Sequence, residues 1–330
     1  MLPTAPRQQV SQERASDDPM RSIEAEGSLL MKKSIAVLCC ALLLVLCFPA
    51  GDFKAQTQDV ILVGAGDIAR CGPENLHYPQ ATATLLDSLP GSVFAIGDLA
   101  YVDGLETEFN RCFDATWGRH RGRLHPVPGV HDMIAPNAFG YFNYFGPSAG
   151  DPTKGYYSFN YGAWHVVVLN SVCTKAPTLP GACTATSPEG QWLQADLAAN
   201  PTACTVALWH TPLYTSSTAD ATPAVQPFWQ ILYNARADLI INGHAHNYER
   251  FAPQDPNGNL DTASGIREFV VGTGGETLMS FDTTLAPNSE VRNSSTNGVI
   301  QITLHATSFD WQFIPVAGQT FTDSGSQACH

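Results

Sequence analysis

Five short polar segments, each placed directly after an apolar run, constrain this chain more than any other feature of its sequence. They are Gly-Asp at 66–67, Gly-Asp-Leu-Ala-Tyr at 97–101, Gly-Val-His-Asp at 129–132, Trp-His at 209–210 and Gly-His-Ala-His at 243–246. The preceding runs are rich in β-branched residues, which is typical of buried strands. We therefore expect the polar residues to lie in loops at the ends of a sheet, where a rigid scaffold holds them.

The residue types in these segments are those that bind first-row metal ions. Carboxylate oxygens, imidazole nitrogens and a phenolate can hold two divalent or trivalent ions. A shared carboxylate keeps two such ions about 3.5–4 Å apart, the spacing that clamps a phosphoryl group during in-line displacement. A metal pair also supplies hydroxide near neutral pH, so no nucleophilic side chain is required. The segments therefore predict a two-metal phosphoesterase.

The order of the five segments resembles that of the calcineurin-like metallophosphoesterases, and the tyrosine of the second segment resembles the purple acid phosphatase branch. The similarity runs from residue 58 to the C-terminus. The resemblance implies two metal sites that share one bridging carboxylate. The first metal, Fe³⁺, is expected on Asp67, Tyr101 and His246, the bridge is Asp98, and the second metal, Zn²⁺, Mn²⁺ or Fe²⁺, is expected on His210 and His244.

The third segment carries the residues that the resemblance places outside the metal shell. His131 is expected to stabilise the transition state or to protonate the leaving oxygen, and Asp132 to orient it. Val130 departs from the family pattern, which has an asparagine whose carbonyl oxygen ligates the second metal. Valine has no lone pair, so we expect weaker binding of that metal and slower turnover. Tyr248, after the last segment, is expected to line the substrate pocket, with packing of the following loop as the alternative.

Each segment taken singly also has a structural explanation. Gly-Asp after a strand is more often a turn than a ligand, and a lone tyrosine is more often a buried aromatic with a satisfied hydroxyl. Their joint occurrence in this order favours ligation. The basic residues at 119–125 could attract phosphate or form a solvated face. His165 and His305 are interpreted as core or sheet histidines.

The start of the chain predicts export. Residues 1–30 are polar, and a charged start at Met31 then leads into the apolar stretch 35–48. This pattern is typical of a signal peptide, and the stretch is short for a transmembrane helix. We expect a secreted or periplasmic protein without a stable membrane anchor. Its expected organisation is a non-native extension over 1–30, a signal peptide over 31–55 and one metallophosphoesterase domain over 56–330.

The cysteines agree with export. Three of the nine lie in the leader, and the even number that remains predicts disulfides. The pairs we expect are Cys173–Cys183, Cys71–Cys112 and Cys204–Cys329. A structural zinc site is the competing use, although no Cys-x-x-Cys occurs. Cys47 allows lipidation as an alternative to simple cleavage.

Composition and periodicity define the expected fold. A net charge of −13 argues against nucleic-acid binding through a basic face. The expected fold is mixed α/β, and with the resemblance it becomes an α-β-β-α sandwich of two mixed sheets with the dimetal site at a sheet edge. Buried strands are expected over 60–65, 93–96, 165–169, 205–209 and 239–242, helices over 79–89, 105–117, 188–199 and 224–236, and a C-terminal antiparallel meander over 269–271, 299–304 and 308–314.

Three functions remain open at this point. The leading prediction is an exported phosphomonoesterase that hydrolyses a small phosphoester by metal-activated hydroxide. The second is a phosphodiesterase or nucleotide hydrolase on the same fold. The third is a catalytically impaired relative that only binds metal or phosphate, because of Val130.

Overall fold

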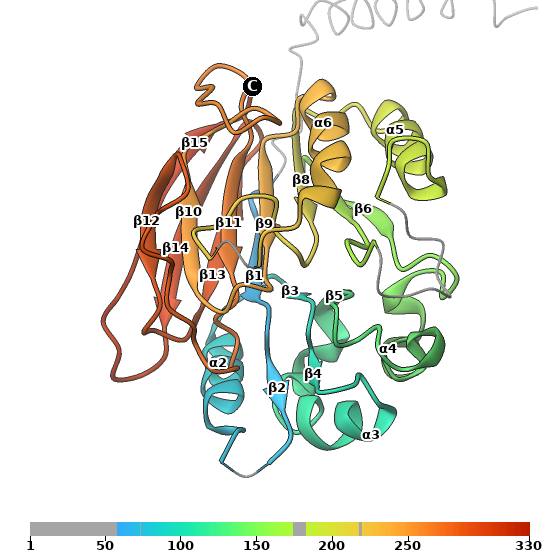
Figure 1. Cartoon of the computed structure of the whole chain (residues 1–330), viewed down its shortest axis with the longest axis vertical. Helices are drawn as coiled ribbons and strands as arrows, with labels where there is room; N and C mark the ends of the chain where they lie inside the picture. The colour runs from blue at the N-terminus through green and yellow to red at the C-terminus, as the bar shows by residue number, and fades with distance from the viewer. Residues whose placement is uncertain (1–57, 73, 174–182, 218–219) are drawn as a thin grey trace, which may run out of the picture. The chain divides into compact units, whose positions relative to one another are not determined.

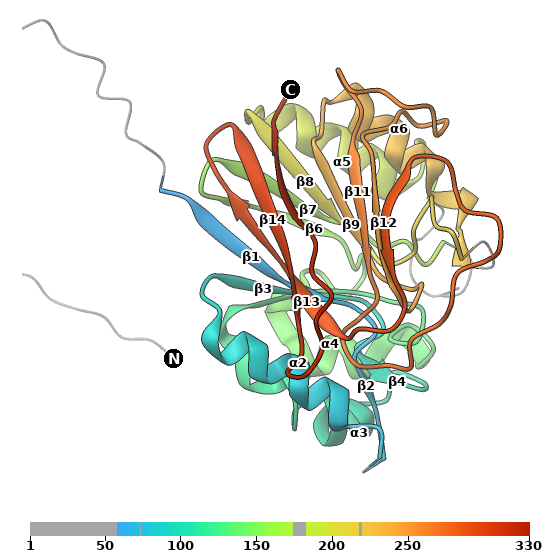
Figure 2. The ribbon, with the colours of Figure 1, turned by 90° about the vertical axis from the view of Figure 1, so that its left-hand side faces the viewer.

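The computed structural model describes residues 58–330 except 73, 174–182 and 218–219. The expected extension and signal peptide therefore lie outside the described residues. The described chain forms two large sheets with helices on their outer faces (Figures 1 and 2). This arrangement confirms the mixed α/β sandwich expected from the sequence.

The first sheet has six strands in the order β15-β14-β13-β1-β3-β5. Strands β1, β3 and β5 run parallel, whereas β13 and its neighbours are antiparallel. The parallel strands carry the first three polar segments at their carboxyl ends. The bounds are β1 Val60–Ala65, β3 Ser92–Ile96, β5 Leu124–Val127, β13 Gly298–Leu304, β14 Ser308–Pro315 and β15 Ser324–Ala328.

The second sheet has seven strands in the order β12-β10-β11-β9-β8-β7-β6. The central strands β7, β8, β9 and β11 are parallel to their neighbours in that group. A two-stranded parallel sheet, β2 with β4, lies beyond the ends of β1 and β3. The bounds are β6 Tyr157–Tyr161, β7 Trp164–Val168, β8 Cys204–Leu208, β9 Leu239–Asn242, β10 Tyr248–Phe251, β11 Arg267–Val271, β12 Ser289–Asn293, β2 Ala69–Arg70 and β4 Ala100–Tyr101.

The C-terminal meander differs from the sequence-based expectation in one strand. Strands β13, β14 and β15 form an antiparallel meander, but 269–271 does not belong to it. That segment lies in β11, which pairs in parallel with β9, so that Phe269 is opposite Ile241. All five residues of β11 are buried, as is typical of a parallel strand covered on both faces.

The helices lie outside the sheets. The helix expected over 188–199 is α5, and Ser187 caps its start because its side-chain oxygen accepts the N–H of Gly190 at 3.0 Å. The helix expected over 105–117 is broken into α3, a π-helical turn over Phe109–Phe113 and a 3₁₀ segment over Trp117–Arg123. The bounds are α2 His77–Ser88, α3 Glu106–Glu108, α4 Phe139–Phe145, α5 Pro188–Ala199 and α6 Gln226–Asn234, with short 3₁₀ turns over Pro136–Ala138, Gly146–Ala149 and Pro223–Val225.

Three disulfides cross-link the described chain. They are the three expected pairs, Cys71–Cys112, Cys173–Cys183 and Cys204–Cys329. Since all six of these sulfurs are paired, the competing zinc site is excluded for them. The bond from Cys204 fastens the start of β8 to a residue separated from it by 125 positions.

The basic residues before the third segment have a structural role. The Arg123 guanidinium donates to the carbonyl oxygens of Leu86, Leu89 and Gly91, which lie at the end of α2 and just beyond it. His120 is buried against the carbonyl of Ala83. These contacts favour helix capping over phosphate attraction. Within the described residues, the helices are too short or too polar to cross a membrane.

Candidate metal centre

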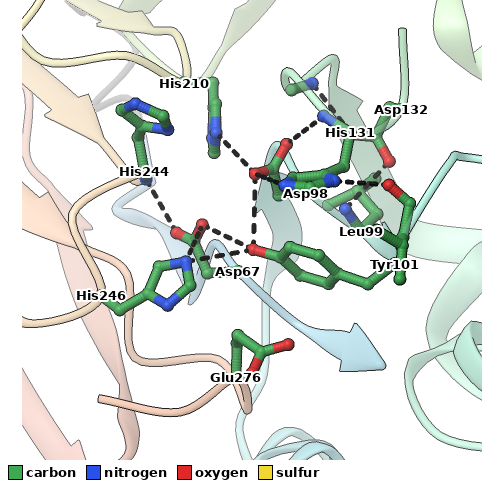
Figure 3. A network of polar contacts seen from close by, with 12 residues as sticks. Asp67, Asp98, Leu99, Tyr101, His131, Asp132, His210, His244, His246 and Glu276 are labelled. Carbon is green, nitrogen blue, oxygen red and sulfur yellow. Dashed lines mark hydrogen bonds and ion pairs between the residues drawn. The ribbon is translucent and has the colours of Figure 1, made fainter. Parts of the chain in front are cut away.

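The polar segments converge at the carboxyl ends of five strands, β1, β3 and β5 of the first sheet and β8 and β9 of the second. Figure 3 shows the expected ligands facing one another from the loops after β1, β3, β8 and β9. Three of these residues, Asp67, Asp98 and His244, have left-handed backbones with φ of 59°, 52° and 70°. Non-glycine residues adopt this conformation rarely, and aspartate and histidine do so more readily than most. The backbone at the strand ends therefore turns sharply to bring these side chains inward.

Glycines make the close approach of these loops possible. Gly97 has φ of 68°, and a Cβ there would lie 2.4 Å from Cγ of His210. A Cβ on Gly129 would lie 2.0 Å from the backbone nitrogen of Asp98. Both distances are far below van der Waals contact, so only glycine allows the second and third segments to approach the others.

One group of donor atoms surrounds Asp67. The Tyr101 hydroxyl donates to Oδ1 of Asp67 at 3.0 Å, and Nε2 of His246 lies 3.3 Å from the same oxygen. The Tyr101 hydroxyl is also 3.3 Å from Nε2 of His246 and 3.4 Å from Oδ2 of Asp98. The four atoms come from the residues expected to form the first metal site.

A second group of donor atoms includes the same carboxylate of Asp98. Nε2 of His210 lies 3.2 Å from Oδ2 of Asp98. Ligand atoms of Asp98, His210 and His244 all lie within 4.8 Å of one another. Asp98 therefore stands between the two groups, as a bridging ligand must.

The histidines are oriented as metal ligands usually are. Nδ1 of His210 donates to the carbonyl of Ile96 at 2.9 Å, and Nδ1 of His246 donates to the carbonyl of Thr277 at 3.0 Å. These bonds hold Nδ1 as a donor and turn Nε2 toward the carboxylates, where a bound metal ion would take the place of the Nε2 proton. Nε2 of His210 is fully buried and makes no hydrogen bond. Such an atom needs a partner, and a metal ion would be one.

The spacing of the donors also fits metal ions. Neighbouring donors that each lie about 2.1 Å from one ion are separated from each other by about 3 Å. The separations around Asp67 are 3.0–3.4 Å. Oxygen and imidazole donors suit iron, zinc and manganese. The residues of this centre therefore fit the metals expected from the sequence.

The ionisation of the centre reflects its burial and its crowded charges. Burial, with the nearby charge of His210, lowers the pKa of His244 to about 4, so that this imidazole is neutral. Burial alone would lower the pKa of His210, but the charge of Asp98 outweighs it and raises the pKa to about 9. Burial and the charge of Asp67 raise the pKa of Tyr101 well above its usual value. A cation bound beside the Tyr101 hydroxyl would offset the effect of burial and of the Asp67 charge, and would favour the phenolate.

His131 lies at the rim of the centre, and its neighbours differ from those expected. Its ring is partly exposed, and Nε2 is 3.9 Å from Oδ2 of Asp98. The expectation that Asp132 orients this ring is wrong, because the Asp132 carboxylate accepts the backbone N–H groups of Leu99 and Gly129, both at 2.9 Å. The carbonyl of Val102 binds Nδ1 of His131 instead. Asp132 thus joins the second segment to the third.

The two remaining expected residues, Val130 and Tyr248, lie in different surroundings from each other. Val130 is 9% exposed. The next residue in the chain, His131, donates its backbone N–H to Oδ1 of Asp98 at 2.7 Å. It therefore belongs to the centre. Tyr248 is fully buried in the core, and its hydroxyl donates to Asp323 at 2.8 Å. The expectation that Tyr248 lines a substrate pocket is wrong.

Sequence reasoning missed a sixth loop, which follows β11. The Glu276 N–H donates to the carbonyl of Asp67 at 2.9 Å, and the next residue, Thr277, binds His246. The Glu276 carboxylate accepts Nε of Arg70 at 2.7 Å, and the Arg70 guanidinium lies 5.1 Å from the centre of the Tyr101 ring. The sequence does carry a pattern that could have predicted this loop, because the glycines of 272–275 follow an apolar strand as in the other segments.

The two-sheet sandwich and the donor set at its strand ends define a metal-binding α/β protein of the phosphoesterase class. The family described as "Calcineurin-like phosphoesterase" matches residues 48–248, and this chain belongs to that family. Membership and the similarity to purple acid phosphatases imply a dimetal centre, usually iron with zinc or manganese.

Named relatives place the chain near the purple acid phosphatases. It is 30% identical to purple acid phosphatase 22 of Arabidopsis thaliana, over 75% of this chain and 58% of that protein. It is 33% identical to purple acid phosphatase 15 of the same plant, over 64% of this chain and 45% of that protein. The chain thus spans about half the length of the curated relatives it matches.

Solved structures share the fold at low sequence identity. Purple acid phosphatase PPD1 from yellow lupin (Lupinus luteus) seeds matches with a TM-score of 0.63 and 18% identity, over 84% of this chain and 55% of that one. GAP50, the anchor in the inner membrane complex of Plasmodium, matches with a TM-score of 0.63 and 11% identity, over 82% and 89% of the two chains. These similarities establish the shared fold.

Proposed function

We propose that this protein is an exported phosphomonoesterase of purple acid phosphatase type, acting on small phosphate monoesters. The observation that carries the proposal is the pair of donor groups that share Asp98, with Nδ1 of His210 and of His246 each held by a backbone carbonyl. Asp67, Tyr101 and His246 would hold Fe³⁺, and His210 with His244 would hold Zn²⁺, Mn²⁺ or Fe²⁺. The three disulfides support export.

Bound metals would lower the pKa of water to supply hydroxide near neutral pH and would polarise the phosphoryl oxygens. The protein residues provide the remaining functions. His131 stands at the rim, where its Nε2 faces the centre and can donate a proton to the departing alkoxide. The carbonyl of Val102 holds the ring, and Asp132 fixes the loop beneath it by binding the Leu99 and Gly129 N–H groups.

A metal-binding protein without catalysis is the second candidate, and Val130 is the observation that favours it. This buried side chain carries two methyl groups at the position where the resemblance implies a ligand oxygen, so the second metal would have fewer protein donors. The fold itself does not require an enzyme, since the GAP50 protein that shares it is described as an anchor.

The deciding experiment combines metal analysis with an assay. Purified protein is loaded with iron and then with zinc or manganese, dialysed, and assayed on an aryl phosphate and on a bis-aryl phosphate. Hydrolysis that favours the aryl phosphate supports the phosphomonoesterase. Faster hydrolysis of the bis-aryl phosphate indicates a phosphodiesterase. Bound metal without hydrolysis of either compound indicates a metal-binding protein that lacks catalysis.

A further inference from the structure

Exposed apolar side chains gather beside His131. The described part of the chain exposes eight large hydrophobic side chains, and four of these lie in the two short stretches 102–105 and 134–139. The four are Val102, Leu105, Ile134 and Phe139, with 43%, 44%, 49% and 55% of their surface exposed. Such a concentration on a small part of the surface is typical of a binding site. We call these four residues the apolar rim.

Backbone hydrogen bonds tie the apolar rim directly to the centre. The Val102 carbonyl binds the ring of His131, and the Ile134 N–H donates to the His131 carbonyl at 3.2 Å. The Ala135 N–H donates to the carbonyl of Asp103 at 3.0 Å, which joins the two stretches to each other. A Cβ on Gly140 would lie 2.7 Å from the backbone of Leu105, so α4 meets the stretch before α3 (Figures 1 and 2).

Hydrogen bonds to one carboxylate support the stretch that carries Val102 and Leu105. The Glu108 carboxylate accepts the N–H groups of Val102 at 2.6 Å, Asp103 at 3.1 Å and Leu105 at 2.9 Å. The side chains of Val102 and Leu105 therefore stand on a fixed backbone, which keeps the entropy lost on binding small. A preformed apolar surface next to a few polar groups is the usual form of a small-molecule site.

The position of His131 indicates which part of a substrate meets this rim. If His131 protonates the leaving oxygen, the organic part of the substrate departs on the side of His131. The rim then contacts that organic part, whereas the phosphoryl group faces the ligands. Asp103 within the stretch 102–105 and Glu106 directly after it are both exposed, and their charges disfavour an anionic leaving group such as a nucleotide.

We propose that the centre hydrolyses phosphate monoesters whose alcohol is uncharged and apolar, with the apolar rim binding the alcohol. This inference rests on the proposed phosphomonoesterase function. It is tested with ethyl phosphate and hexyl phosphate, whose leaving alcohols have similar acidity and differ only in apolar length. We expect kcat/KM to be at least about tenfold higher for hexyl phosphate, since each buried CH₂ favours binding.

Substitutions in the rim assign the preference to these residues. In the double variant Ile134→Ser with Phe139→Ser, the ratio of kcat/KM for hexyl over ethyl phosphate should fall at least fivefold. Leu260→Ser is the matched control, because Leu260 is 59% exposed and lies in the loop after β10. It should leave the ratio unchanged. Calorimetry with hexylphosphonate and ethylphosphonate should give the same order of affinities without turnover.

The outcomes separate this inference from the function on which it rests. Equal hydrolysis of the two esters, or a ratio that the double variant does not change, overturns the inference and leaves the phosphomonoesterase intact. Hydrolysis of neither ester overturns both. Binding to lipid vesicles, or dimerisation, that the double variant abolishes while the ratio stays near one would show that the rim contacts a membrane or a second copy, and this also overturns the inference.

Discussion

Nδ1 of His131 donates to the main-chain carbonyl oxygen of Val102 at 2.5 Å. The bond fixes the ring and the position of one proton, so that Nε2 is the atom that faces the centre. A histidine held in this way can exchange a proton with a leaving group without binding metal. The role of His131 is therefore separable from those of the ligands by experiment.

Replacing His131 by Ala should lower kcat by roughly 10²- to 10⁴-fold, because general acids contribute by that amount. Metal content should stay unchanged, and esters with acidic leaving alcohols should be affected least. Steady-state kinetics with metal analysis of the same sample measures both. His305→Ala is the control, since His305 contacts Asp59 and Asp310 at a distance from the centre. Loss of metal in His131→Ala would make His131 a ligand.

Replacing Tyr101 by Phe should remove the colour of the iron-loaded protein. Phenolate bound to ferric iron absorbs visible light, so the parent protein should be pink to purple. Tyr157→Phe is the matched control, because Tyr157 also loses only a hydroxyl, which donates to the Pro126 carbonyl at 3.0 Å. Visible spectra of the three proteins make the comparison. If Tyr101→Phe stays coloured, Tyr101 does not bind the iron.

Replacing Val130 by Asn should strengthen the second metal site. We expect the parent protein to keep about one metal per chain after dialysis. The asparagine variant should keep two and turn over roughly tenfold or more faster. Val130→Ala enlarges the space without adding an oxygen, and it should not restore the metal. Two metals already present in the dialysed parent, with no gain in Val130→Asn, would mean that another group supplies the ligand.

Glu268→Gln should change how stability depends on pH. Glu268 is fully buried, and burial, with the charge of Glu249, raises its pKa well above the usual 4.5. At pH values between 4.5 and this raised pKa, Glu268 has lost its proton in the unfolded chain but keeps it in the folded chain. The parent therefore loses stability as pH rises through this range. Each pH unit in that window lowers the free energy of unfolding by about 1.4 kcal/mol.

The Glu268→Gln variant lacks this pH-dependent loss of stability. Its free energy of unfolding, relative to that of the parent, should therefore increase from pH 5 to pH 8. Urea denaturation at both pH values measures the free energy of unfolding. Glu106→Gln removes the same charge from an exposed position and should show no such trend. A constant difference between Glu268→Gln and the parent would mean that Glu268 is ionised in the folded protein.

Local patterns predicted the parts of this fold that depend on neighbouring residues. Strands β1 and β9 begin and end where their apolar runs do, and α5 begins at its capping serine. The ordered polar segments predicted which side chains gather at the strand ends. These signals are local because a strand, a cap and a turn are each specified by a few adjacent residues.

The parts that were missed depend on contacts between distant residues. The hydroxyl of Tyr248 binds Asp323, which is 75 positions away, and its ring packs against the distant Phe313 and Phe321. Asp132 binds backbone N–H groups of the second segment, 33 and 32 positions away, rather than the adjacent histidine. The sequence alone contains no signal that distinguishes these partners from nearer ones.

The left-handed backbone at Asp67, Asp98 and His244 limits how this centre can change during evolution. A β-branched residue at any of these positions would remove a proposed metal ligand and would also disfavour the turn, by roughly 1–2 kcal/mol. Val130 is not among the described residues with positive φ. A valine can therefore arise there by mutation without straining the backbone. Of these four positions, residue 130 is therefore the one where a proposed metal ligand could be replaced by valine at the least cost to the fold.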